Sequence, residues 1–315
     1  MDSKTDADSH GKIENRYDLV LIFDVQDGNP NGDPDADNAP RMDDLTQQGI
    51  VSNVCINRKL RNRVELVKGG KTPYAIYVTD GAILSDKKRA AYKELGLEVE
   101  TMPDAAPRAG GAKGKNAPKP KVKRSGDTID QARQFMCENY WDVRTFGAVM
   151  NTSTPAGTVR GPFQTTFARS VHPIAPKDHT ITRCADENFE ERKAGDNRTM
   201  GRRYTVPYGC YVGHAFLSPQ DAAKTGFSLT DLELLKQSLN MMFESDRASN
   251  RGLMTMRGIY AFKHDNLLGR AQAGRLFERI SVKGIGEVPR DFGDIEVAID
   301  KERLPEGVTL EDWLV

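Results

Sequence analysis

The chain has 315 residues, enough for one large domain or two ordinary ones, and 38% of them are hydrophobic, which indicates a globular protein. No apolar run is long enough to span a bilayer, and a net charge of zero does not by itself indicate a nucleic-acid-binding protein. The four cysteines form no CxxC pair, which favours free thiols in a reducing compartment over a disulfide framework or a zinc site. Residues 1–15 are polar and lack an apolar signal region, so we expect a disordered tail on a cytoplasmic protein.

Charge is distributed unevenly along the chain. Residues 1–44 carry a net charge of −8 and residues 284–315 carry −6, whereas residues 51–71 and 247–279 each carry +5. Residues 108–124 hold seven bases and no acid. Acidic ends and basic middle segments suit a chain that binds a polyanion and docks head-to-tail on copies of itself. For any one of these charged segments, a solvent-exposed surface is the simpler explanation.

The first predicted elements are a strand, a loop and a helix. Tyr17–Val25 is a near-continuous apolar run and predicts a buried strand. Residues 29–38 are too rich in Pro, Gly and Asn for regular structure. A helix is expected to follow Ser52 as its N-cap. Its apolar stripe consists of Ile56, Leu60, Val64 and Val67, and its opposite side carries Arg58, Arg61 and Asn62.

Helices are expected near residues 86–95 and over 128–140, separated by the low-complexity segment 108–124, which should be disordered or a flexible loop. Residues 143–149 and 163–171 are predicted to form strands. Residues 180–184 and 202–217 predict the two strands of a long projecting β-hairpin.

The last third of the chain predicts a helix, a strand, a helix and a strand. Thr230 and Glu233 suggest a capping box for a helix that reaches about Glu244. The remaining elements are expected at 258–262 (strand), 271–280 (helix) and 295–299 (strand). The whole order is a βαββαβ, ferredoxin-like plan with its middle enlarged by insertions, although a fold of this kind does not assign a function.

The acidic loop has several interpretations. Four aspartates stand at positions 1, 3, 5 and 12 of a calcium-binding module over residues 33–44: Asp33, Asp35, Asp37 and Asp44. Asn38 stands where that loop needs glycine, the last acid is Asp rather than Glu, and a strand precedes the loop instead of a helix. Metal-assisted cleavage of RNA, or acid-base chemistry by one Asp, is a second interpretation. The simplest is a loop whose Asn and Asp side chains cap their own backbone.

Two other segments are candidates for nucleic-acid contact. The start of the helix after Ser52 offers free N–H groups, a positive dipole end and two arginines, which together make a phosphate site without base selectivity. Residues 197–204, "NRTMGRRY", place Met200 among arginines, as in apolar wedges that enter between bases. For both, the alternative is an ordinary basic surface.

Six blocks of sequence, in this order, carry a resemblance to a known family: "FDVQDGNPNGDPDADNAPR", "GIVSNVCINRKLRN", "DVRTFGAV", "GPFQTTFARSVHPI", "DNRTMGRRYTVPYG" and "YAFKHDNLLG". Together they resemble the DevR/Csd-type RAMP proteins of CRISPR systems, and most closely the backbone, crRNA-binding subunit of the type I-C Cascade complex.

The resemblance implies an α+β fold with a modified RNA-recognition-motif palm, an inserted finger region and a protruding β-hairpin thumb. It implies a subunit that is not a nuclease, needs no cofactor or metal, and polymerises along one crRNA, leaving most bases free to pair with target DNA. Its implied partners are other copies of itself, the 5′-handle-binding, large and small Cascade subunits and a recruited helicase-nuclease. No membrane is implied. Related RAMP proteins of type III systems cut RNA with an Asp in the corresponding loop, so a metal-dependent ribonuclease using Asp33 stays open.

The resemblance also implies boundaries and contacts. The tail is 1–15; the palm is 16–71, 140–178 and 205–315; the finger is 72–139, with its flexible basic loop at 108–124; the thumb is 179–204. RNA contacts are expected at Asn31, Arg41, Ser52, Asn53, Arg58, Arg61, Arg144, Phe146, Gln164, Arg169, Met200, Arg202 and Arg203. Contacts with target DNA are expected at Lys119, Lys121, Lys123 and Arg124.

Overall fold

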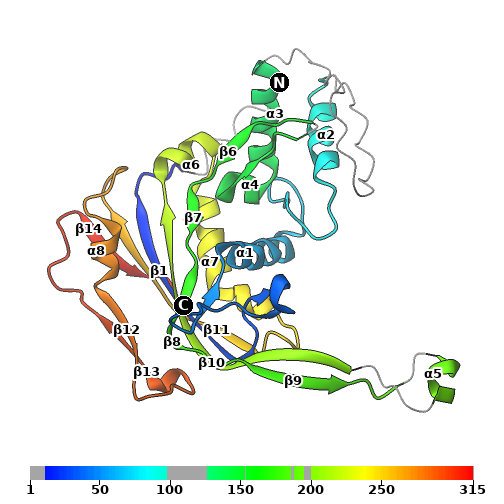
Figure 1. The fold of residues 1–315 in the computed structure, drawn as a ribbon. Coiled ribbons are helices and arrows are strands. Elements are labelled where there is room, and N and C mark those ends of the chain that lie inside the picture. Colours follow the sequence, from blue (N-terminus) through cyan, green and yellow to red (C-terminus); the bar gives the residue numbers. More distant parts are fainter. Residues whose placement is uncertain (1–10, 98–125, 153, 186–187, 195–199, 315) are drawn as a thin grey trace, which may run out of the picture. The chain divides into compact units, whose positions relative to one another are not determined.

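The computed structural model describes residues 11–97, 126–152, 154–185, 188–194 and 200–314, and Figure 1 labels their helices and strands. The chain forms two compact units. The first unit comprises residues 1–13, 64–162 and 220–231, and the second comprises residues 14–63, 163–219 and 232–315.

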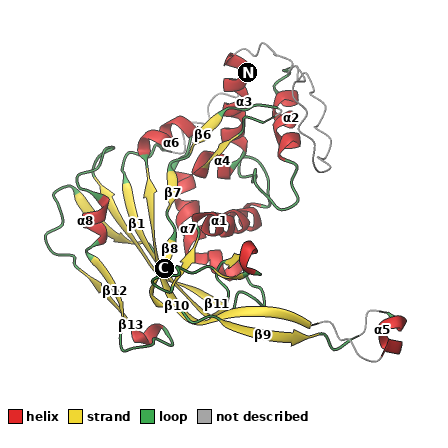
Figure 2. Ribbon diagram, in the orientation of Figure 1, coloured by secondary structure: helices red, strands yellow, loops and turns green. Residues whose placement is uncertain are grey.

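A central antiparallel sheet organises the second unit (Figure 2). Its strands are β1 (Tyr17–Gly28), β4 (Gln48–Val51), β7 (Phe163–Thr165), β8 (Ala168–Pro173), β9 (Lys177–Thr182), β10 (Met200–Leu217), β11 (Leu253–His264) and β14 (Val308–Asp312). They run in the order β14-β11-β1-β10-β8-β4, with β7 and β9 also paired to β10. β1 pairs with β10 from Tyr17 opposite Leu217 to Gly28 opposite Val206. The chain is therefore a mixed α/β protein with a central antiparallel sheet.

Both faces of this sheet are covered, which explains why β1 is apolar at consecutive positions. On one face Phe23 packs against Phe243 of α7 (Leu229–Ser245), with ring centroids 5.3 Å apart. The other face packs on α8 (Ala273–Phe277), β12 (Ile280–Gly284) and β13 (Ile295–Ile299). The buried cluster there includes Val20, Ile22, Cys210, Phe262, Leu276, Ile280, Ile295 and Val308. Burying an aliphatic side chain of this size contributes about 1.5–3 kcal/mol.

Shorter elements complete the second unit. They are β2 (Gly32–Asp33), η1 (Pro34–Ala36), β3 (Ala39–Pro40), α5 (Phe189–Ala194) and η2 (Phe292–Asp294). Among the described helices, three begin in one unit and end in the other: α1 (Asn53–Lys68), α6 (Pro219–Thr225) and α7.

The first unit is mainly helical. Its elements are α2 (Leu84–Glu94), α3 (Gly126–Asn139), α4 (Trp141–Phe146), β5 (Gly147–Val149) and β6 (Thr158–Arg160). Its core contains Tyr77, Ala91, Tyr92, Ala132, Met136, Val143, Met150 and Ala156. The buried carboxylate of Asp142 accepts hydrogen bonds from the N–H groups of Tyr77 and Val78, at 2.6 and 3.1 Å. Among the described residues, no helix combines the length and the apolar character needed to cross a membrane.

Most elements predicted by periodicity are confirmed. The first strand is β1, the helix after Ser52 is α1, and the long hairpin is β9–β10. The order strand, helix, strands, helix, strand is also found, as β1, α1, β7–β10, α7 and β11. The predicted loop over 29–38 differs slightly, since β2 and η1 give it short regular segments.

One prediction is wrong: residues 143–146 belong to helix α4 instead of a strand, and only β5 follows as predicted. A short apolar run does not distinguish the two conformations. Here the rings of Trp141 and Phe146, the first and last residues of α4, pack edge to face with their centroids 5.4 Å apart. Gly147 ends the helix with φ +84°, a left-handed conformation that glycine adopts without strain.

The predicted details of three helices need smaller corrections. The capping box of α7 uses Ser228 and Asp231 in place of Thr230 and Glu233: the Ser228 N–H donates to Asp231, and the Asp231 N–H donates to Ser228 Oγ. Val67 of α1 is 48% exposed, so the apolar stripe ends one turn earlier. α8 is shorter than residues 271–280, because β12 begins at Ile280.

Candidate nucleic-acid interface

The first turn of α1 is held by a network of side chains from the loop after β1. Asn31 Oδ1 accepts hydrogen bonds from both the N–H and the Oγ of Ser52, each at 2.8 Å. Ser52 Oγ in turn accepts the N–H of Cys55 at 3.3 Å, as an N-cap does. The Cys55 thiol donates to the Pro30 carbonyl at 3.4 Å. The predicted residues Asn31 and Ser52 are thus brought together, and they fix where the helix begins.

Arg58 and Arg61 lie one and two turns further along α1, and both are partly exposed. Arg58 Nε donates to Asn62 Oδ1 at 3.0 Å, which holds this side chain along the helix surface. Asn57, between them and the first turn, accepts a hydrogen bond from Thr165 of β7 at 3.1 Å and attaches α1 to the sheet. The two arginines are therefore mounted on a rigid helix whose start is capped, an arrangement suited to phosphate groups.

The acidic loop is occupied by contacts within the protein. Asp33 accepts the N–H of Asp35 at 3.1 Å and forms a 3.2 Å ion pair with Arg41. Hydrogen bonds from the Thr46 N–H and the Arg169 guanidinium lower the pKa of Asp43 below its ordinary value. Asp37 and Asn38 both have positive φ, +51° and +59°, so Asn38 makes the turn without glycine.

No group of three or more His, Cys, Asp or Glu side chains lies close enough together to hold a metal ion within the described residues, which include all of 33–44. The carboxylates of Asp33 and Asp43 act as local caps and ion-pair partners, which fits the simplest of the interpretations that the sequence allowed.

The hairpin β9–β10 projects beyond the sheet (Figure 1), with α5 at its far end. Met200 stands opposite Thr182 and its side chain is 71% exposed. Arg202 lies 3.8 Å from Asp178 across the hairpin, and Arg203 stands opposite His179. The exposed methionine is therefore followed by two arginines on the same strand of a two-stranded ribbon. Arg198 lies outside the described residues.

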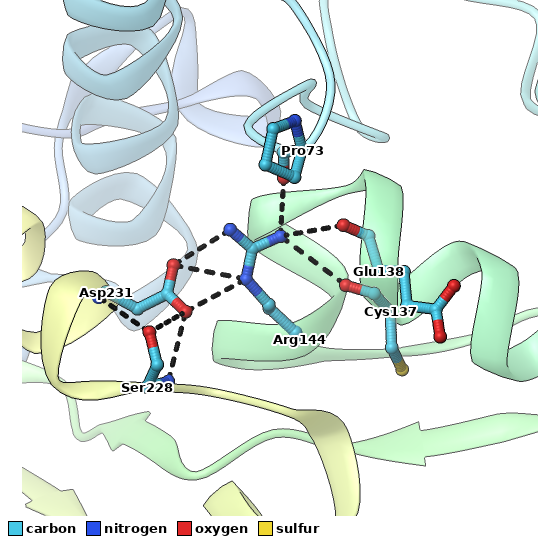
Figure 3. Close-up of polar contacts among 6 residues, drawn as sticks. All are labelled: Pro73, Cys137, Glu138, Arg144, Ser228 and Asp231. Carbon is cyan, nitrogen blue, oxygen red and sulfur yellow. Dashed lines mark hydrogen bonds and ion pairs between the residues drawn. The ribbon is translucent and has the colours of Figure 1, made fainter. Parts of the chain in front are cut away.

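The structure gives Arg144 a different role from the predicted RNA contact, because its side chain is buried in the first unit (Figure 3). Its guanidinium forms a bidentate ion pair with Asp231, with the closest N–O distance 2.8 Å. It also donates to the carbonyls of Pro73, Cys137 and Glu138. We therefore exclude it from the interface.

The other predicted residues fall into four groups. Phe146 is buried against Trp141 and is also excluded. Gln164 and Arg169 are exposed, with Arg169 3.0 Å from Asp43. Asn53 is partly exposed in the first turn of α1, and its contact with RNA stays a prediction. The basic residues Lys119, Lys121, Lys123 and Arg124 lie outside the described residues.

One charged group at this site was missed from the sequence. Lys59 of α1 is almost fully buried and pairs with Asp246, at the end of α7. Lys59 stands three residues after Ile56 and next to Leu60, so the helical periodicity places it on the apolar stripe. This position could have predicted the ion pair, because a lysine on a buried face needs a buried partner of opposite charge.

Fold and site together define a mixed α/β protein whose capped helix and projecting hairpin expose arginines. Comparison with known proteins gives the family. The family model described as CRISPR-associated protein Cas7 matches residues 15–300, so the chain belongs to the Cas7 family.

A curated relative, the CRISPR-associated protein Cas7 of Haloferax volcanii, is 25% identical over 223 residues. That match covers 70% of this chain and 62% of the relative. Two solved structures are also similar. One is titled a CRISPR RNA-guided surveillance complex, pre-nicking (TM-score 0.46, 14% identity, 78% of each chain). The other is titled a CRISPR RNA-guided surveillance complex (TM-score 0.43, 13% identity, 78% of this chain and 68% of that one).

Proposed function

We propose that this Cas7-family chain is the crRNA-binding backbone subunit of a cytoplasmic Cascade complex of type I-C. The partly exposed arginines on the capped helix α1 carry this function. Asn31 and Ser52 fix the start of α1, and Arg58 and Arg61 project from its partly exposed side. A protein that holds guides of any sequence should contact phosphates and leave base edges free. Membership of the Cas7 family supports the same assignment.

The proposed palm is a modified RNA-recognition-motif fold. Its support is the strand order β11-β1-β10-β8, with α1 following β1 and α7 following β10. In that fold one sheet face usually stacks bases on aromatic side chains. Here the face opposite α7 is covered by α8, β12 and β13. RNA must therefore be held by α1 and the loops, which favours a grip on the backbone.

The proposed division of the chain keeps the predicted boundaries: palm 16–71, 140–178 and 205–315, finger 72–139 and thumb 179–204. Met200, 71% exposed on the thumb, is the proposed wedge that displaces a base, with Arg202 and Arg203 on adjacent phosphates. Copies would assemble head-to-tail along one crRNA, present it to target DNA and join the other Cascade subunits. The basic loop 108–124 is a proposed contact for target DNA.

The subunit is proposed to be non-catalytic, and its ribonuclease alternative is directly testable. Complex purified with a guide RNA is expected to leave complementary RNA intact in the presence of Mg²⁺. The reason is that the Asp33 carboxylate already pairs with Arg41 and caps Asp35. The measurement is gel analysis of end-labelled target, with the exposed neighbour variant Asp35→Ala as the matched control. Periodic cuts that vanish in Asp33→Ala but persist in Asp35→Ala would show that Asp33 is catalytic.

A further inference from the structure

The 246–252 loop (Asp246–Gly252) joins α7 to β11 and carries two arginines, Arg247 and Arg251. The loop is tightly attached to the end of β1. The Asn29 N–H donates to the Asn250 carbonyl at 2.8 Å. A Cβ on Gly28 would lie 1.9 Å from the Arg251 carbonyl oxygen, and Gly252 has φ +62°. Two glycines thus allow the backbones to touch, so the loop holds its side chains in fixed positions.

Within this loop, Asp246 is shared between two cations. It pairs with the buried Lys59 of α1 and lies 3.1 Å from Arg251 Nε. Lys59 is 2% exposed at its side chain, and its Nζ also lies 5.8 Å from the centroid of the Phe243 ring. A buried ammonium needs its carboxylate, so Asp246 is already neutralised by Lys59. The cluster of three charges is therefore net positive, and its excess charge belongs to Arg251.

Arg251 remains accessible. Its side chain is 36% exposed, and among the described contacts Nε is the atom that binds Asp246. The outer nitrogens of a guanidinium are those that bind phosphate in a fork. The loop therefore holds Arg251 through Nε, while part of its side chain stays accessible.

Lys59 joins this cluster to α1 one turn after Cys55, which stands in the first turn of the helix. Burial raises the pKa of the Cys55 thiol, while the positive charges of Lys59, Arg251 and Arg41 lower it and Asp246 raises it. Arg41 is linked to the first turn of α1 through Asn31, since its N–H donates to the Asn31 carbonyl at 3.1 Å, and its Nη1 pairs with Asp33 at 3.2 Å. Arg41 Nε is buried with no hydrogen-bond partner among the described residues.

We infer that Arg251, together with Arg41, forms a second RNA-phosphate contact beside the first turn of α1, so that the 246–252 loop adds to the grip of Arg58 and Arg61 on the guide backbone. This inference rests on the proposed function. It adds Arg251, which lies in the last segment of the proposed palm, to the residues that bind RNA. The contact is with phosphate, so it should be indifferent to base sequence.

The test is binding of a fluorescein-labelled single-stranded RNA, in two unrelated sequences, to the full chain over a range of salt concentrations. Arg251→Ala is expected to weaken both RNAs equally, by about fivefold to tenfold, and to reduce the slope of log affinity against log salt by about 0.7. Arg251→Lys keeps the charge and is expected to retain the wild-type slope. The matched control is Arg270→Ala, which removes another arginine that pairs with a nearby aspartate, Asp265. Thermal unfolding of each variant is measured in parallel.

The outcomes separate this inference from the proposed function. If Arg251→Ala binds like Arg270→Ala while Arg58→Ala with Arg61→Ala weakens binding, the inference is overturned and the function stands. If none of these variants weakens RNA binding, the proposed function fails as well. If Arg251→Lys loses as much salt dependence as Arg251→Ala, or if lost binding follows lost thermal stability in both, Arg251 is structural and the inference is again overturned.

Discussion

Replacing Asp231 with alanine is expected to destabilise the first unit by about 3–5 kcal/mol. Arg144 and Asp231 are 6% and 4% exposed at their side chains, and the guanidinium is further fixed by three backbone carbonyls (Figure 3). Removing the carboxylate leaves a buried, uncompensated positive charge. It also removes the acceptor for the Ser228 N–H and hydroxyl, which cap α7. Both losses act in the same direction.

The two tryptophans allow this effect to be measured in the full chain. Trp141 belongs to the first unit and Trp313 to the second, so in a Trp313→Phe background the fluorescence of Trp141 follows the first unit during urea unfolding. The matched control is Arg133→Ala, which breaks an exposed ion pair with Asp130 and should cost about 0–1 kcal/mol. Equal unfolding midpoints for Asp231→Ala and Arg133→Ala would contradict a structural role for the buried pair.

Replacing both Arg58 and Arg61 with alanine is expected to weaken binding of single-stranded RNA by roughly 10- to 100-fold. Each arginine removed should also reduce the slope of log affinity against log salt by about 0.7, because fewer counterions are released. The loss should be the same for unrelated sequences, since phosphates carry no sequence information. Fluorescence anisotropy with two RNAs of unrelated sequence measures all three quantities.

The control for this double variant is a second one that removes the same charge elsewhere. Arg275 and Arg290 are exposed arginines of the second unit, in α8 and before η2. Arg275→Ala with Arg290→Ala is expected to change affinity little. If both double variants weaken RNA binding equally, the effect comes from general charge, and α1 is no specific phosphate site.

The fold was predictable for those strands and helices whose burial produces a hydrophobic pattern within their own sequence. β1 is apolar at every position from Leu19 to Phe23 because both faces of the sheet are covered, and that continuous run is visible in the sequence. The hairpin and α7 follow from alternation and helical periodicity in the same way. α4 was mispredicted, since six residues are too few for periodicity to distinguish helix from strand.

The candidate site was predictable to the extent that it is local. Ser52 as the N-cap and the arginines of α1 lie within one helix, so their spacing placed them correctly. The partners of Arg144 and Lys59 come from far along the chain, at Asp231 and Asp246, 87 and 187 residues away. Such pairings depend on tertiary structure. The local sequence therefore does not distinguish an arginine that forms a buried ion pair from one that is free to bind RNA.

The central claim is that copies of this chain bind guide RNA along the length of the RNA. The most direct measurement is to co-express it with a CRISPR array, purify it and sequence the RNA that comes with it. The account predicts RNA of guide length, with all spacers of the array represented, and loss of that RNA in the Arg58→Ala, Arg61→Ala variant. Purified protein that carries no RNA, or only RNA unrelated to the array, would contradict it.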